Sequence, residues 1–140
     1  MSTQVIGVAL LLTGLSWLWV HYAWGAGSGE LPHPWEAMAM RLHALAALLA
    51  VFVFGAVAAS HVQHAWRSTL RRHLDHQRHL GVALCTLGAA LALTGYALMY
   101  LVSEAARPAL GWLHTAIGVA MAVVLLIHQR SARRRRHRHG

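Results

Sequence analysis

Four stretches of this sequence are long enough and apolar enough to cross a lipid bilayer. Hydrophobic residues make up 57% of the 140 residues and charged residues only 11%, which is too apolar for an ordinary soluble domain. A helix needs about 20 mostly apolar residues to span the hydrocarbon core of a membrane. The sequence therefore predicts four membrane-spanning helices, at residues 4–24, 35–61, 79–102 and 108–128.

Short connections separate these four segments. Helices joined by short loops usually pack antiparallel, so we expect an all-α membrane protein, a four-transmembrane-helix antiparallel bundle. Residues 1–140 are expected to form this single membrane domain, with a basic tail at residues 129–140. The first segment has no positive charge before it and is longer than the apolar core of a secretory signal. We expect it to be retained as a helix.

The distribution of arginine predicts the orientation in the membrane, because short Arg-rich loops stay in the cytoplasm. Most arginines lie in the loop after the second segment and in the tail: Arg67, Arg71, Arg72, Arg78, Arg130, Arg133, Arg134, Arg135, Arg136 and Arg138. Both termini are therefore expected to be cytoplasmic, in a multi-pass membrane protein. We interpret the net charge of +8 as an orientation signal. The tail is expected to contact anionic membrane lipid, and no nucleic acid is expected as a partner.

Twelve histidines are present. Four of them lie within the predicted helices at two different depths in the membrane, which we call the outer and the inner level. His114 and His128 are 14 residues apart, or roughly 21 Å along a helix. They belong to one stripe of the last segment, with Gly111, Gly118, Met121 and Leu125. His43 and His61 lie 18 residues apart on the second segment. Ionisable side chains inside a membrane segment usually face the protein interior and indicate a functional site.

These two levels are candidate metal-binding sites, since neutral imidazole is the commonest protein ligand for metals. His43 and His114 both lie roughly 9–12 Å below the outer surface by helix geometry, so we expect them to bind one metal as a pair. His61 and His128 are the expected inner pair. The 18-residue spacing of His43 and His61 exceeds the 14-residue spacing of His114 and His128 by about 6 Å of helix rise. His64 and His79 are competing candidates for the inner ligand. The alternative for any one of these histidines is a hydrogen bond to a neighbouring carbonyl group.

The rest of the sequence indicates what kind of metal group these histidines would hold. Cys85 is the only cysteine and no C-x-x-C-H motif is present, so a haem would be bound without covalent attachment. Glycines recur every seventh residue on three segments, and Gly14, Gly88 and Gly118 are expected to line a slot for a flat macrocycle. Close packing of two helices is an equally good explanation of these glycines. Arg41 could pair with a haem propionate or extend to the lipid headgroups.

With His43, Arg41, His114 and the glycine spacing, residues 5–130 resemble the small four-helix, diheme b-type membrane cytochromes of bacteria. That class includes the cytochrome b subunits that anchor respiratory dehydrogenases and hydrogenases. The resemblance implies two non-covalent haem b groups, the outer held by His43 and His114 and the inner by His61 and His128. It also implies electron exchange with quinone or with a redox partner protein. The 18-residue spacing of the second segment departs from the regular pattern of the class.

Iron with two histidine ligands has no open position and suits electron transfer. The expected function is therefore electron transfer across or within the membrane, by the chain alone or as the membrane subunit of an oxidoreductase in a homo- or hetero-oligomer. Aromatic residues of the outer half could line a quinone pocket with His21, His33, Glu36 or Glu104. The alternatives are a His-lined metal or proton transporter and a non-catalytic anchor or assembly subunit. Transporters usually have broken helices and acidic ligands, which these segments almost lack.

Overall fold

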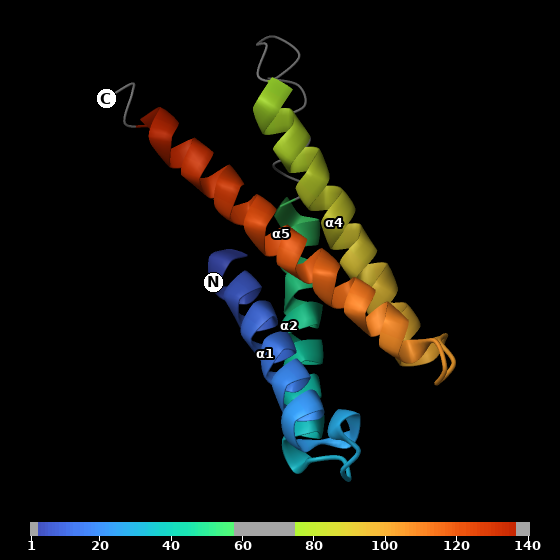
Figure 1. Ribbon diagram of the computed structural model, residues 1–140. Coiled ribbons are helices and arrows are strands. Elements are labelled where there is room, and N and C mark those ends of the chain that lie inside the picture. Colours follow the sequence, from blue (N-terminus) through green and yellow to red (C-terminus); the bar gives the residue numbers. More distant parts are fainter. Residues whose placement is uncertain (1–2, 58–74, 137–140) are drawn as a thin grey trace. The chain divides into compact units, whose positions relative to one another are not determined.

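The computed structural model describes residues 3–57 and 75–136, and every regular element in these two ranges is helical. Helices α1 and α2 cover Thr3–Trp24 and Pro34–Val57, with a short 3-10 turn, η1 (Ala26–Ser28), between them. Helices α4 and α5 cover Asp75–Tyr100 and Arg107–Arg136 (Figure 1). All four helices are long and apolar enough to cross a membrane. The prediction of an all-α chain with four membrane-length helices is confirmed.

The observed helix ends differ from the predicted ends where polar residues continue a helix. Helix α4 begins at Asp75, before the predicted residue 79, and α5 continues to Arg136, past the predicted residue 128. Arginine and glutamine are good helix formers, so the backbone can stay helical after the apolar run ends. At the other end of α5, Pro108 lies in the first turn, where its missing N–H costs no hydrogen bond. The predicted end of the second segment at residue 61 lies outside the described residues.

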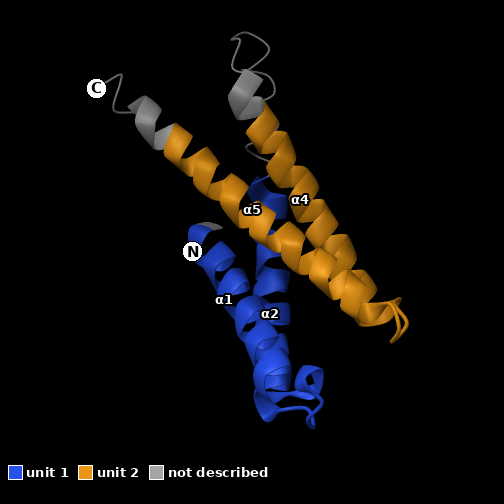
Figure 2. Cartoon of the chain, in the orientation of Figure 1, with its two compact units in different colours: residues 1–63 blue, residues 64–140 orange. Residues whose placement is uncertain are grey.

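The chain divides into two compact units, residues 1–63 and 64–140 (Figure 2). Each unit contains one helical hairpin, α1 with α2 and α4 with α5. The side-chain contacts run in opposite directions along the two helices of each hairpin. Thr13 of α1 contacts His43, while the later His21 contacts the earlier Glu36. In the second hairpin, Thr94 contacts His114, and the earlier Gly88 lies against the later Met121. Both hairpins are therefore antiparallel, as predicted.

In the first hairpin, α2 presents a face of small residues. Its buried residues are Glu36, Ala39, Ala46 and Ala50, and His43 lies in the same series of three- and four-residue steps. Such steps place side chains on one face of a helix. Two members of this series bond to side chains of α1, so the face is turned toward α1. Small side chains allow two helix backbones to approach closely in a membrane.

In the second hairpin, side chains of each helix lie over glycines of the other. A β-carbon placed on Gly88 of α4 would lie 3.8 Å from Met121 Cε. On α5, a β-carbon on Gly118 would lie 3.9 Å from Leu91 Cδ2. Met121 is buried. The middle of the stripe predicted on the last segment therefore faces α4.

Replacing Ala46 with leucine should destabilise the first hairpin, because the larger side chain has no room at the contact with α1. Overpacking of this kind typically costs about 1–3 kcal/mol. The free energy of unfolding in detergent micelles measures the effect. Ala44→Leu is the matched control, because Ala44 is exposed on the same helix. An equal effect of the two substitutions would contradict the assigned helix face.

Candidate functional site

His43 lies in the third turn of α2, roughly 14 Å along the helix from Pro34, and it is half-buried. Its Nδ1 atom is 3.0 Å from the Oγ1 atom of Thr13 in α1. The Thr13 hydroxyl also donates to the carbonyl oxygen of Ala9, one turn earlier, at 2.7 Å. The imidazole lies against Gly14, where a β-carbon would come within 3.2 Å of His43 Cε1. Thr13 and Gly14 together hold the ring between the two helices.

His114 has the same surroundings in the second hairpin. It lies in α5, roughly 11 Å from the start of the helix at Arg107, and it is half-buried. Its Nδ1 atom is 2.7 Å from Thr94 Oγ1 in α4, and the Thr94 hydroxyl donates to the Ala90 carbonyl oxygen at 2.7 Å. A β-carbon on Gly95 would lie 3.5 Å from His114 Cε1.

These matching contacts follow from a repeated sequence. Residues 9–14 read A-L-L-L-T-G and residues 90–95 read A-L-A-L-T-G, so the pattern A-L-x-L-T-G occurs once in α1 and once in α4. A leucine–histidine pair follows each copy, at residues 42–43 and 113–114. Reasoning from histidine and glycine spacing alone missed this repeat and the two threonines. A comparison of the first half of the chain with the second would have found them.

The predicted outer ligands, His43 and His114, belong to different compact units of the chain. Their pairing on one metal therefore stays a prediction. Arg41 is exposed on α2, two residues before His43, and its role toward a propionate also stays a prediction. Of the inner ligands, His61 lies outside the described residues, as does the competing His64. The other competing candidate, His79, is exposed near the start of α4.

His128, the second predicted inner ligand, is half-buried in the C-terminal half of α5. Its Nδ1 atom is buried and has no hydrogen-bond partner among the residues that the structure describes. A buried polar atom without a partner typically costs about 1–3 kcal/mol. His128 thus differs from His43 and His114, whose Nδ1 atoms each contact a threonine hydroxyl.

The three glycines expected to line a haem slot all make contacts within their own hairpins. Gly14 lies against the His43 ring, Gly88 against Met121, and Gly118 against Leu91. These are contacts of helix packing, which was the alternative explanation of the glycine spacing. Contact of these glycines with a haem stays a prediction.

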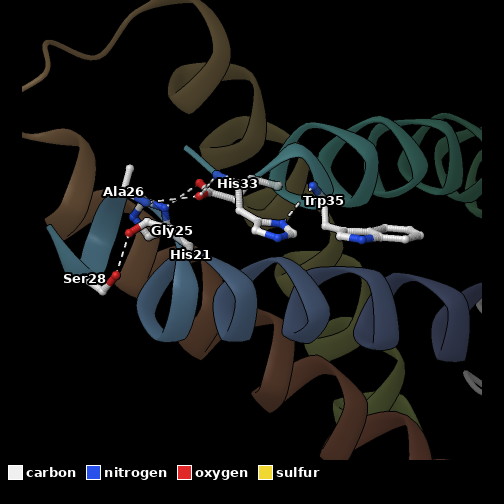
Figure 3. A network of polar contacts seen from close by, with 7 residues as sticks. His21, Gly25, Ala26, Ser28, His33 and Trp35 are labelled. Carbon is white, nitrogen blue, oxygen red and sulfur yellow. Dashed lines mark hydrogen bonds and ion pairs between the residues drawn. The ribbon is translucent and has the colours of Figure 1, made fainter. Parts of the chain in front are cut away.

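A second polar cluster lies at the loop end of the first hairpin, where Figure 3 labels His21, Ala26 and His33. These three residues all contact the carboxylate of Glu36. Oε2 of Glu36 is 2.8 Å from His21 Nδ1. Oε1 accepts hydrogen bonds from the backbone N–H groups of Ala26, at 3.1 Å, and His33, at 3.0 Å. The N–H of Trp35 donates to His33 Nδ1 at 3.2 Å. Glu36 and His33 thus form a capping box at the start of α2, with histidine in the position that serine or threonine usually occupies.

The loop packs tightly around this carboxylate. Gly25 is buried, and a β-carbon there would overlap the Glu36 side chain. A β-carbon on Gly27 would lie 2.7 Å from the His21 ring, and Trp17 stacks on that ring at 4.6 Å between centroids. Gly29, with φ of 90°, ends the turn in a conformation that favours glycine. The structure therefore gives Glu36 a role in holding the loop.

Three of the four polar residues suggested for a quinone pocket, His21, His33 and Glu36, belong to this cluster. The fourth, Glu104, lies in the other unit and forms an exposed ion pair with Arg107 at 3.1 Å. The first hairpin also carries an open hollow of about 210 Å³, which is mostly apolar. It is lined by Thr13, Ser16, Val20, Trp35, Met38, Ala39 and Leu42. Thr13 therefore borders the hollow and contacts His43.

Comparison of the sequence with protein-family models and curated proteins, and with solved structures, gives no match. The candidate site is therefore defined by its own contacts. These are the two Thr–His pairs, the unpartnered nitrogen of His128, and the Glu36 cluster.

Replacing Glu36 with alanine should loosen the loop between α1 and α2. The substitution removes the acceptor of the Ala26 and His33 amides, and a hydrogen bond to a charged group typically contributes about 1.5–3 kcal/mol. Hydrogen exchange at these two amides should become about tenfold faster or more. Glu104→Ala is the control, because its exposed ion pair contributes little. Unchanged exchange at Ala26 and His33 in Glu36→Ala would contradict the role given to this carboxylate.

Proposed function

We propose that this chain is a b-type haem cytochrome that carries electrons across or within a membrane. The observation that carries the proposal is the repeated contact in which each hairpin fixes one histidine inside a membrane-length helix. An imidazole in a membrane segment is costly unless it serves a function or has partners. Here both halves of the chain keep one histidine, at similar distances from the helix start, with the same threonine and glycine neighbours.

The donor set fits a haem better than a bare metal ion. Among the described residues, no three or more His, Cys, Asp or Glu side chains form a group that could hold a metal ion. A haem needs only one or two axial protein ligands, because the porphyrin supplies the others. Single histidines on separate helices, in apolar surroundings, match this requirement. His43 and His114 would hold the outer haem.

The buried Nδ1 atom of His128, which has no hydrogen-bond partner within residues 3–57 and 75–136, supports a second haem site near the other end of α5. His128 lies 14 residues from His114 on this helix, so two sites would be separated by roughly 21 Å along its axis. His61, on the continuation of the second segment, is the proposed partner of His128.

In this proposal the haem supplies the one-electron redox chemistry when bound, and the chain determines where the electron can go. Arg41 would pair with a propionate, and Gly14, Gly88 and Gly118 would leave room beside the macrocycle. The four apolar helices give a low-dielectric environment in the membrane. The arginine distribution supports cytoplasmic termini, and the resemblance to bacterial membrane cytochromes supports a location in the bacterial inner membrane. Quinone or a redox partner protein would supply or accept the electron, and the chain could act within an oligomer.

Haem spectra of the purified protein test the proposal. The reduced-minus-oxidised spectrum should contain sharp b-type bands, and His43→Ala or His114→Ala should remove the bands of the outer haem because each variant loses one axial ligand. His137→Ala is a matched control, since His137 belongs to the basic tail. A folded wild-type protein without haem would contradict the proposal and favour a transporter or an anchor subunit.

The ratio of haem to protein tests the second site. Wild-type protein should bind about two haems per chain if two bis-histidine sites are present, and His128→Ala should retain one. The outer haem should keep its spectrum in this variant, because His43 and His114 are unchanged. A wild-type ratio of one haem, unaffected by His128→Ala, would restrict the proposal to the outer site.

A further inference from the structure

The two Thr–His pairs have the same arrangement of hydrogen-bond contacts. In each hairpin the threonine hydroxyl lies 2.7 Å from the carbonyl oxygen four residues earlier, in Ala9 and in Ala90. It lies 3.2 or 3.3 Å from the carbonyl oxygen three residues earlier. The same hydroxyl oxygen lies 3.0 or 2.7 Å from the histidine Nδ1 atom. This agreement indicates that the two pairs have the same role.

The protons available to these groups determine the direction of each hydrogen bond. A threonine hydroxyl has a single proton, and the short contact with the carbonyl oxygen uses it, since a carbonyl can only accept. With the proton in that contact, the hydroxyl oxygen accepts a hydrogen bond from the histidine, so in our assignment Nδ1 carries the ring proton. With Nδ1–H as the donor, a neutral imidazole has its lone pair on Nε2. In the opposite tautomer the hydroxyl would donate to Nδ1, and its 2.7 Å contact with the carbonyl oxygen would contain no hydrogen bond.

We propose that Thr13 and Thr94 are positioning residues that hold His43 and His114 as Nδ1–H tautomers and thereby make Nε2 the metal-binding nitrogen of each. The inference rests on the proposed haem function for the identity of the metal group. Metal-binding histidines commonly donate their other N–H to a neighbouring acceptor, which fixes the tautomer and the ring orientation. In this chain the acceptor is a threonine hydroxyl of the preceding helix. The contact of this hydroxyl with a backbone carbonyl oxygen of the same helix holds it in place.

The threonines should also affect the redox potential. An acceptor for Nδ1–H makes the imidazole a stronger donor to the metal. A stronger donor stabilises ferric iron more than ferrous iron, so the intact pairs lower the potential. Loss of either hydroxyl should therefore raise the midpoint potential of the haem that the affected histidine binds.

Valine substitutions test this inference, since valine replaces the hydroxyl by a methyl group of similar size. Thr13→Val and Thr94→Val should each shift the midpoint potential of one haem to a more positive value. Haem affinity should fall about tenfold or more, the usual effect of removing a partner of a metal-binding side chain. Thr86→Val and Thr115→Val are matched controls. Their hydroxyls donate to the backbone of their own helices, at Val82 and Gly111, and both potential and affinity should stay unchanged.

A second measurement does not depend on bound haem. Nitrogen-15 NMR of histidine-labelled, haem-free full-length protein should show His43 and His114 protonated at Nδ1, with a mixture of tautomers after the corresponding Thr→Val substitution. Unchanged tautomers and an unchanged potential in both variants would overturn this inference and leave the haem proposal standing. A wild-type protein that shows the predicted tautomers but never binds haem would overturn the haem function and leave the assignment of the tautomers to the threonines standing.

Discussion

The need to satisfy polar side chains within the membrane segments determines how each hairpin is built. Water is scarce there, so an imidazole must find its partners in the protein. Each hairpin supplies one from the preceding helix, through Thr13 for His43 and Thr94 for His114. The glycine after each threonine lets the ring approach the helix backbone. A hydroxyl, a glycine and an imidazole therefore form one structural unit, present twice.

The two ends of the first hairpin use polar groups differently. At the loop end, Glu36 accepts two backbone N–H groups and contacts His21, so its hydrogen bonds hold the loop and the start of α2. Farther along α2, the Nδ1 atom of His43 contacts the Thr13 hydroxyl between the two helices. The cluster around Glu36 therefore organises the loop, whereas metal binding by His43 remains our proposal.

The sequence predicted the helices well, because the length of an apolar run directly reflects the thickness of a bilayer. It also predicted similar depths for His43 and His114, by counting residues along a helix, and this stays a prediction. It did not identify Thr13 or Thr94 as partners. A threonine in an apolar helix gives no spacing signal of its own, and the partner of its hydroxyl depends on how two helices rotate against each other. The capping role of Glu36 was missed because His33 replaces the usual serine or threonine.

The order of the residues in each hairpin also matters while the chain is being synthesised. Both threonines precede their histidines in the sequence, and N-terminal parts of a protein emerge from the ribosome first. The hydroxyl acceptor is thus already in the membrane when the helix that carries the imidazole arrives. The imidazoles of His43 and His114 can therefore each contact a partner within the same half of the chain. The protein can therefore insert into the bilayer as two successive hairpins, each with its own Thr–His contact formed.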